Sequence, residues 1–129
     1  MIQHISAVTF AVRDMSPSVE FYGKLGFELQ YGGARAVFTS FKAGDAFVNL
    51  LARPGYERQW WGRAIFRVDD VDEHYRSLQA HGLRAEPPRD APWGERFFHL
   101  IDPDGHELSF AQQLSEKNSR RGVSDFTED

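Results

Sequence analysis

Apolar residues alternate with small or polar ones in two stretches of the chain, 6–12 and 63–68. This period of two is typical of a strand that buries one face. After each stretch the apolar residues change to a spacing of i, i+4 and i+7, which predicts one amphipathic helix behind each strand. The helical positions are Met15, Val19 and Tyr22 in the first case and Val71, Tyr75 and Leu78 in the second.

The two stretches form an internal repeat with an offset of 56 residues. Its matched pairs include Val8 with Ala64, Phe10 with Phe66, Val12 with Val68, Asp14 with Asp70, and Gly26 with Gly82. Because the match continues through a strand, a cap and a helical face, it indicates two copies of one structural unit.

Polar and glycine residues predict where the helices begin and end. Ser16 is the expected N-cap of the first helix, with Pro17 in its first position. Asp70 with Glu73 three residues later has the spacing of a capping box. Gly26 and Gly82 stand where a left-handed residue is needed after each helix.

Three short strands are expected after each helix. They cover 28–31, 36–41 and 46–51 in the first copy, and 84–86, 96–101 and 107–111 in the second. Asp102-Pro103-Asp104-Gly105 predicts a tight turn between the last two strands. The fold class is therefore α+β, with two βαβββ modules (4–52 and 60–113) in one domain, 1–114, followed by a polar tail, 115–129, that we expect to be flexible.

Composition narrows the classes of function. The chain has 129 residues, 15 basic and 19 acidic, and a net charge of −4, which argues against nucleic-acid binding. It has no cysteine, so disulfides and thiolate metal sites are excluded. No apolar run or leader pattern predicts membrane insertion or export, and we expect a cytoplasmic protein. Its 3 Trp, 4 Tyr and 11 Phe are a rich aromatic supply.

Alternation assigns one face of each strand to the helices and leaves the other face for a second use. The second set is Ala7, Thr9 and Ala11; Phe47, Asn49 and Leu51; Arg63, Ile65 and Arg67; and Glu107, Ser109 and Ala111. This set is too polar for a dry core. We expect the modules to curl these faces into a concave cleft that holds a ligand.

The chain resembles the vicinal oxygen chelate superfamily, which includes glyoxalase I, extradiol dioxygenases and bleomycin-resistance proteins. The resemblance rests on the βαβββ repeat, on Phe21-Tyr22-Gly23-Lys24-Leu25-Gly26-Phe27 closing the first helix, and on Asp102-Pro103-Asp104-Gly105-His106. It covers roughly residues 5–113. It implies that fold, with a curved mixed sheet around the cleft.

Enzymes of the superfamily hold a divalent metal at four strand positions, which the resemblance places at Ala7, Asn49, Arg63 and Ser109. Alanine offers no donor, and arginine is a fixed cation that repels a metal. His4 falls on the opposite strand face from Ala7, and Glu107 alone does not rebuild the site. We therefore expect no metal and no cofactor.

Without a metal, the resemblance is nearest to the bleomycin-resistance type, through Pro92-Trp93-Gly94-Glu95-Arg96-Phe97. It implies an acidic homodimer that sequesters flat cationic rings on aromatic side chains. Trp93 would then line a groove, although packing beneath its own loop is an equal alternative. Arg63 and Arg67 in the cleft argue against a cationic ligand.

The candidate ligand-binding residues are Asn49, Trp61, Arg63, Trp93, His99, Glu107 and Ser109. At most one of Trp60 and Trp61 enters the cleft, because neighbours on an extended segment point to opposite sides. Arg63 either clamps a ligand or pairs with Glu107. Among the histidines, His74 is expected on the exposed helix face, and His99 remains a cleft candidate.

Three functions stay open. The first is metal-independent binding of a planar or aromatic small molecule by a homodimer. The second is a glyoxalase-like lyase or isomerase, or a dioxygenase, with an unrecognised metal site or with acid–base chemistry at His99 or Glu107. The third is a role in assembly with a vestigial cleft.

Overall fold

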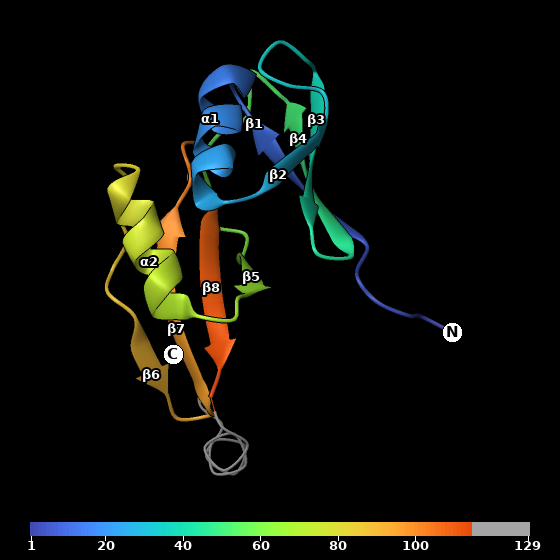
Figure 1. Ribbon diagram of the computed structural model, residues 1–129. Helices are drawn as coiled ribbons and strands as arrows, with labels where there is room; N and C mark the ends of the chain where they lie inside the picture. Colours follow the sequence, from blue (N-terminus) through green and yellow to red (C-terminus); the bar gives the residue numbers. More distant parts are fainter. Residues whose placement is uncertain (115–129) are drawn as a thin grey trace. The chain divides into compact units, whose positions relative to one another are not determined.

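The computed structural model describes residues 1–114, which form eight strands and two helices (Figure 1). They fall into two compact units. The first comprises Met1–Trp61 and Asp102–His106; the second comprises Gly62–Ile101 and the described residues from 107 to 114. The predicted polar tail, 115–129, lies outside the described residues. No helix in the described part of the chain is long and apolar enough to cross a membrane.

The first unit contains a four-stranded mixed sheet in the order β1-β4-β3-β2. The strands are β1 (Ala7–Val12), β2 (Glu28–Tyr31), β3 (Phe38–Ala43) and β4 (Ala46–Ala52). β1 runs parallel to β4, and the other pairs are antiparallel. Helix α1 (Met15–Leu25) contributes Tyr22 and Leu25 to a core that also contains Phe10, Phe41 and Val48.

The start of α1 differs from the prediction. Asp14, in an extended conformation, is the N-cap, and its carboxylate accepts the Ser16 N–H at 3.3 Å. The predicted Ser16 cap is wrong. The Asp14 side chain satisfies the backbone N–H of Ser16, so the helix begins at Met15, two residues before Pro17. At the other end Gly26 has φ 108°, as the left-handed cap requires.

The second unit repeats the topology, with the sheet order β5-β8-β7-β6. Its elements are β5 (Arg63–Arg67), α2 (Val71–Ala80), β6 (Arg89–Ala91), β7 (Glu95–Ile101) and β8 (Glu107–Gln113). The Asp70 carboxylate caps α2 by accepting the Glu73 N–H at 3.1 Å, and Gly82 follows the helix with φ 82°. The prediction of two βαβββ modules in an α+β fold is confirmed.

Two strands lie elsewhere than the sequence suggested. β6 occupies Arg89–Ala91 instead of 84–86, because Pro87 and Pro88 have no N–H for a ladder and pairing with β7 starts only after them. β3 begins at Phe38 and not at Ala36, because the Ala36 N–H is used in a turn to the Gly33 carbonyl at 3.0 Å.

His74 is also placed differently from the prediction. Its ring centroid lies 4.6 Å from that of Phe110 and 6.4 Å from that of Phe98, so the half-buried side chain packs on the sheet. The expectation of an exposed helix face is wrong, because residue 74 stands three after Val71 and four before Leu78, on the buried stripe of α2.

The turn between β7 and β8 belongs to the first unit. Asp102 Oδ2 accepts the Tyr22 hydroxyl at 2.7 Å, and Asp102 Oδ1 accepts the backbone N–H groups of Asp104 and His106 at 2.9 and 2.8 Å. Asp104 Oδ1 accepts from Arg13 Nε at 2.8 Å and from its backbone N–H at 3.0 Å. The two buried carboxylates therefore fasten this turn by hydrogen bonds.

His106 completes this arrangement. Its Nε2 lies 2.7 Å from the Ala11 carbonyl, and its Nδ1 lies 2.7 Å from the Trp61 indole nitrogen. Because the indole N–H only donates, Nδ1 is the acceptor and Nε2 carries the proton that is donated to Ala11. The ring also packs 5.1 Å from Phe10 and 5.2 Å from Tyr56, so His106 serves the structure of the first unit.

Candidate functional site

The face of the second sheet that points away from α2 is called the open face here. Alternation assigns to it Arg63, Ile65 and Arg67 of β5, Phe97 and His99 of β7, and Glu107, Ser109 and Ala111 of β8. One row crosses all four strands in register: Arg67, Ala111, Phe97 and Arg89. A guanidinium group therefore stands at each end of a row whose centre is apolar.

A ladder of three aromatic rings lies on this face. The indole of Trp93 is stacked on Phe97, with centroids 6.4 Å apart and an interplanar angle of 14°. The His99 ring follows at 5.0 Å from Phe97. Phe97 is buried whereas Trp93 and His99 are only partly buried, so the latter two rings keep accessible surface for a ligand.

A tight turn positions Trp93. The Gly94 N–H donates to the Ala91 carbonyl at 3.2 Å, with Pro92 at the second position of the turn and Gly94 at φ 95°. The indole N–H then donates to Glu95 Oε1 at 2.9 Å. Trp93 thus packs on its own hairpin, the alternative raised from the sequence, while one part of the indole stays accessible.

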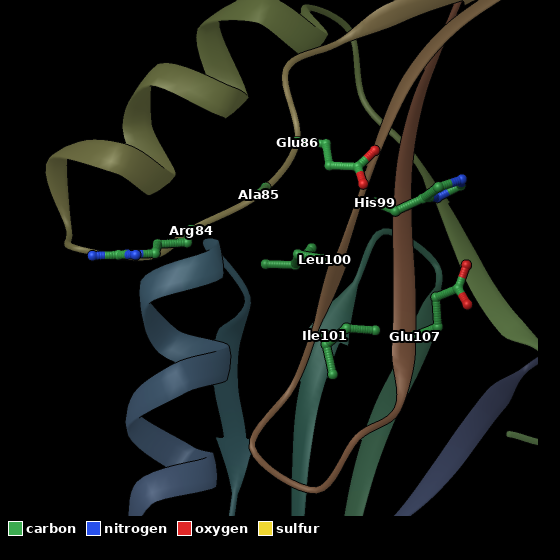
Figure 2. Close-up of a pocket in the computed structure, with 7 residues that line it drawn as sticks. All are labelled: Arg84, Ala85, Glu86, His99, Leu100, Ile101 and Glu107. Carbon is green, nitrogen blue, oxygen red and sulfur yellow. The ribbon is translucent and has the colours of Figure 1, made fainter. Parts of the chain in front are cut away.

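A cavity of about 530 Å³ opens at the edge of β7 beyond β6. It is lined by Arg84, Ala85, Glu86, His99, Leu100, Ile101 and Glu107. Figure 2 shows Arg84 extending away from Glu86, His99 and Glu107. The cavity is large enough for a small organic molecule, and His99 connects it to the aromatic ladder.

Arg63 and Glu107 form an ion pair at the first row of the open face. Arg63 Nε lies 2.7 Å from Glu107 Oε2, and the two side chains are 26% and 16% exposed. The two residues are direct register partners on β5 and β8. The ion pair that the sequence offered as one reading of Arg63 is thus present.

The remaining predicted residues divide between the two units. Ser109 is buried and is the register partner of His99 across the β7–β8 pair. Its hydroxyl donates to the Phe98 carbonyl at 3.3 Å. Asn49 belongs to the first unit and donates to Thr9 Oγ1 at 3.3 Å. Trp61, also in the first unit, donates its indole N–H to His106 Nδ1 at 2.7 Å. The structure brings together Arg63, Trp93, His99, Glu107 and Ser109 on one sheet.

Sequence reasoning missed two residues of this site. Strand alternation could have identified Phe97, since it stands two residues before His99 and lies on the same face of the strand. Arg89, whose guanidinium carbon lies 5.0 Å from the Phe97 ring centroid, was not available, because the strand that carries it was expected at 84–86.

Comparison with known proteins gives the class. Residues 2–110 match the Glyoxalase/Bleomycin resistance protein/Dioxygenase superfamily, and the chain belongs to this family. A bleomycin resistance protein of Klebsiella pneumoniae is 29% identical over 109 residues, which are 78% of this chain and 85% of that protein.

Solved structures agree with this assignment. A bleomycin resistance determinant encoded on the transposon Tn5 has a TM-score of 0.73 and 26% identity, covering 86% of this chain and 98% of that one. A bleomycin-binding protein complexed with bleomycin has a TM-score of 0.71 and 26% identity, covering 87% and 99%.

The resemblance places the metal positions of the superfamily's enzymes at Ala7, Asn49, Arg63 and Ser109, residue types that suit a divalent metal poorly. The guanidinium of Arg63 forms an ion pair with Glu107, and the Ser109 hydroxyl donates a hydrogen bond to the Phe98 carbonyl. In residues 1–114 no group of three or more His, Cys, Asp or Glu side chains is arranged to hold a metal ion. A divalent cation at Arg63 would face a permanent positive charge.

Proposed function

We propose that this protein sequesters a planar aromatic small molecule on the open face of the second sheet, without a metal. The observation that carries the proposal is the ladder of Trp93, Phe97 and His99, which ends at a cavity of about 530 Å³. A flat ring stacking on the accessible part of Trp93 gains dispersion and hydrophobic energy without any reaction. The similarity to bleomycin-resistance and bleomycin-binding proteins supports a binding role.

The same proposal assigns roles to the other predicted residues. His99 and Glu107 contact the part of the ligand in the cavity, Arg63 holds Glu107 in place, and the buried Ser109 supports β7 through its hydrogen bond to the Phe98 carbonyl. Asn49 and Trp61 are proposed as ligand-binding residues of the first unit by itself. Relatives that bind or resist a drug make antibiotic resistance a candidate biological role.

Ligand titration tests the aromatic site. A panel of two- and three-ring planar compounds is titrated into the protein by calorimetry, and at least one is expected to bind with micromolar Kd. Trp93→Leu should weaken that compound at least about 5-fold, because a lost stacking contact of this kind is worth about 1 kcal/mol beyond its area. Trp60→Leu, at an exposed indole of the first unit, is the matched control. A panel without any micromolar ligand would refute the proposal.

Metal independence has its own test. Protein purified without chelator or affinity tag is expected to contain no stoichiometric Zn, Mn, Ni or Fe by elemental analysis. Its ligand affinity should be unchanged after treatment with a chelator. A stoichiometric metal that is needed for binding would transfer the assignment to the metal-dependent enzymes of the family.

We also propose that the protein is a cytoplasmic homodimer, as the resemblance to bleomycin-resistance proteins implies. Light scattering coupled to gel filtration is expected to give twice the mass of one 14.8 kDa chain. A mass of one chain at micromolar concentration would contradict this part of the proposal.

A further inference from the structure

The carboxylates of the open face already have donors. Glu107 is paired with Arg63 at 2.7 Å. Glu95 Oε1 accepts the Trp93 indole N–H at 2.9 Å. A cationic ligand would have to displace Arg63 from Glu107, or the indole from Glu95, before it could use either carboxylate.

The guanidinium of Arg67 is in the opposite situation. Its side chain is 62% exposed, it donates one hydrogen bond, to Gln113 Oε1 at 3.1 Å, and its contact with Glu95 is long at 3.9 Å. A guanidinium carries five N–H donors in a planar fork that matches a carboxylate or phosphate. Arg67 therefore has donors available for an anionic group.

The second guanidinium of the row supports the same sign of charge. The Arg89 guanidinium carbon lies 5.0 Å from the Phe97 ring centroid, within cation–π distance. Arg67 and Arg89 are separated by three strand spacings, roughly 14 Å between their backbones. Phe97, on which the Trp93 ring is stacked, lies between them in this row.

The charge of this face departs from that of the whole chain. Among the described residues of its strands, Arg63, Arg67 and Arg89 stand against Glu95 and Glu107, an excess of one positive charge. Arg84 and Glu86 at the cavity add one charge of each sign. The chain as a whole carries −4. The described residues of this face thus carry a charge opposite in sign to that of the whole chain.

We infer that the ligand of this site is a planar aromatic molecule with an anionic oxygen group, such as an aromatic carboxylate. Its ring stacks on Trp93, and its acid group accepts hydrogen bonds from the guanidinium of Arg67. This inference rests on the proposed function and specifies its ligand class. It differs from the flat cationic rings that the resemblance implies.

Three probes with one ring system and different charge test the inference. They are naphthalene-2-carboxylate, naphthalen-2-ylmethylammonium and the neutral naphthalene-2-methanol, each titrated by calorimetry at low and high salt. The carboxylate is expected to bind at least 10-fold more tightly than the ammonium compound. Its advantage over the neutral alcohol should shrink as salt is raised, because Arg67 is exposed.

Substitutions locate the effect. Arg67→Gln should weaken the carboxylate about 5- to 10-fold and leave the neutral alcohol unchanged. Arg76→Gln, which removes an exposed arginine from α2, is the matched control and should change neither. Circular dichroism of both variants verifies that they fold.

The outcomes separate the two proposals. If the ammonium compound or the neutral alcohol binds as tightly as the carboxylate, the anionic ligand class is refuted while aromatic binding stands. If Arg67→Gln leaves the carboxylate unaffected, Arg67 is not its partner and the inference fails. If none of the three binds and no other planar compound does, the proposed function fails together with the inference.

Discussion

The hydroxyl of Tyr22 donates a 2.7 Å hydrogen bond to Oδ2 of Asp102, which lies 80 positions further along the chain. Tyr22 is fully buried and Asp102 is 4% exposed. The pKa of the Asp102 carboxyl is raised above its ordinary value because burial outweighs the opposing effect of the hydrogen bonds from Tyr22 and from the His106 and Asp104 backbone. This contact fixes the Asp102–His106 turn within the first unit.

Removing the Tyr22 hydroxyl should destabilise the protein. In Tyr22→Phe, Asp102 Oδ2 is left without that donor in a buried place, which costs about 1–3 kcal/mol of unfolding free energy. Urea denaturation followed by circular dichroism measures the loss. Tyr31→Phe is the control, since Tyr31 is 67% exposed, and it should change the free energy by less than about 0.5 kcal/mol. Equal stability of wild type and Tyr22→Phe would show that the contact contributes nothing.

The same pair predicts a loss of stability at alkaline pH. Burial, and after it the Asp102 carboxylate, raise the pKa of Tyr22 well above its usual value. Above about pH 10 the unfolded chain therefore releases this proton while the folded chain keeps it, so stability falls as pH rises. The stability advantage of wild type over Tyr22→Phe should shrink by about 1.4 kcal/mol per pH unit in that range. A constant difference between pH 9 and pH 11 would contradict this.

Two glycines, one inside α1 and one directly after it, should respond in opposite directions to alanine. Gly23 lies inside the helix, and a Cβ there meets nothing within 4 Å, so Gly23→Ala should stabilise by about 0.5–1 kcal/mol. Gly26 has φ 108°, which an L side chain rarely adopts, and Gly26→Ala should destabilise by about 1–2 kcal/mol. Thermal and urea unfolding of both variants measure the effects. The same sign at both sites would refute the cap assignment.

His106 should control the fluorescence of Trp61. In a background of Trp60→Phe and Trp93→Phe, Trp61 is the remaining tryptophan of the 3 in the chain. His106→Ala removes the acceptor of its indole N–H and the ring between Phe10 and Tyr56. Emission should then shift to longer wavelength, and stability should fall by about 1–3 kcal/mol. His4→Ala, at an exposed position, should leave the spectrum unchanged.

The sequence predicted the parts of the fold that local rules govern. The alternation of Phe10 and Val12 with smaller residues, the Asp70 cap and the glycine after each helix all depend on neighbours a few residues away. Ser16 failed as a cap because Asp14, two residues earlier, has the same capping chemistry.

The side-chain contacts between residues far apart in the chain could not be predicted from the sequence. The local pattern of Asp102 and Asp104 predicts a turn, but Tyr22 and Arg13, which bind them, lie 80 and 91 positions away. The open face could be predicted in part, since strand alternation places Arg67 and Arg63 on the same face. The stacking of Trp93 on Phe97 depends on the β6–β7 hairpin, whose first strand the sequence pattern misplaced.

The Asp102–His106 segment has a consequence for how the chain reaches its native state. The first unit lacks this segment until nearly the whole second copy of the repeat has been synthesised. Until then Tyr22, Arg13 and Trp61 have no acceptors from the segment, so a nascent chain that ends at residue 61 is an unfinished unit. The two copies are therefore separable as sequence but not as folding units. Cutting the gene at the midpoint of the repeat should yield an amino-terminal fragment that becomes native only when a peptide containing Asp102–His106 is supplied.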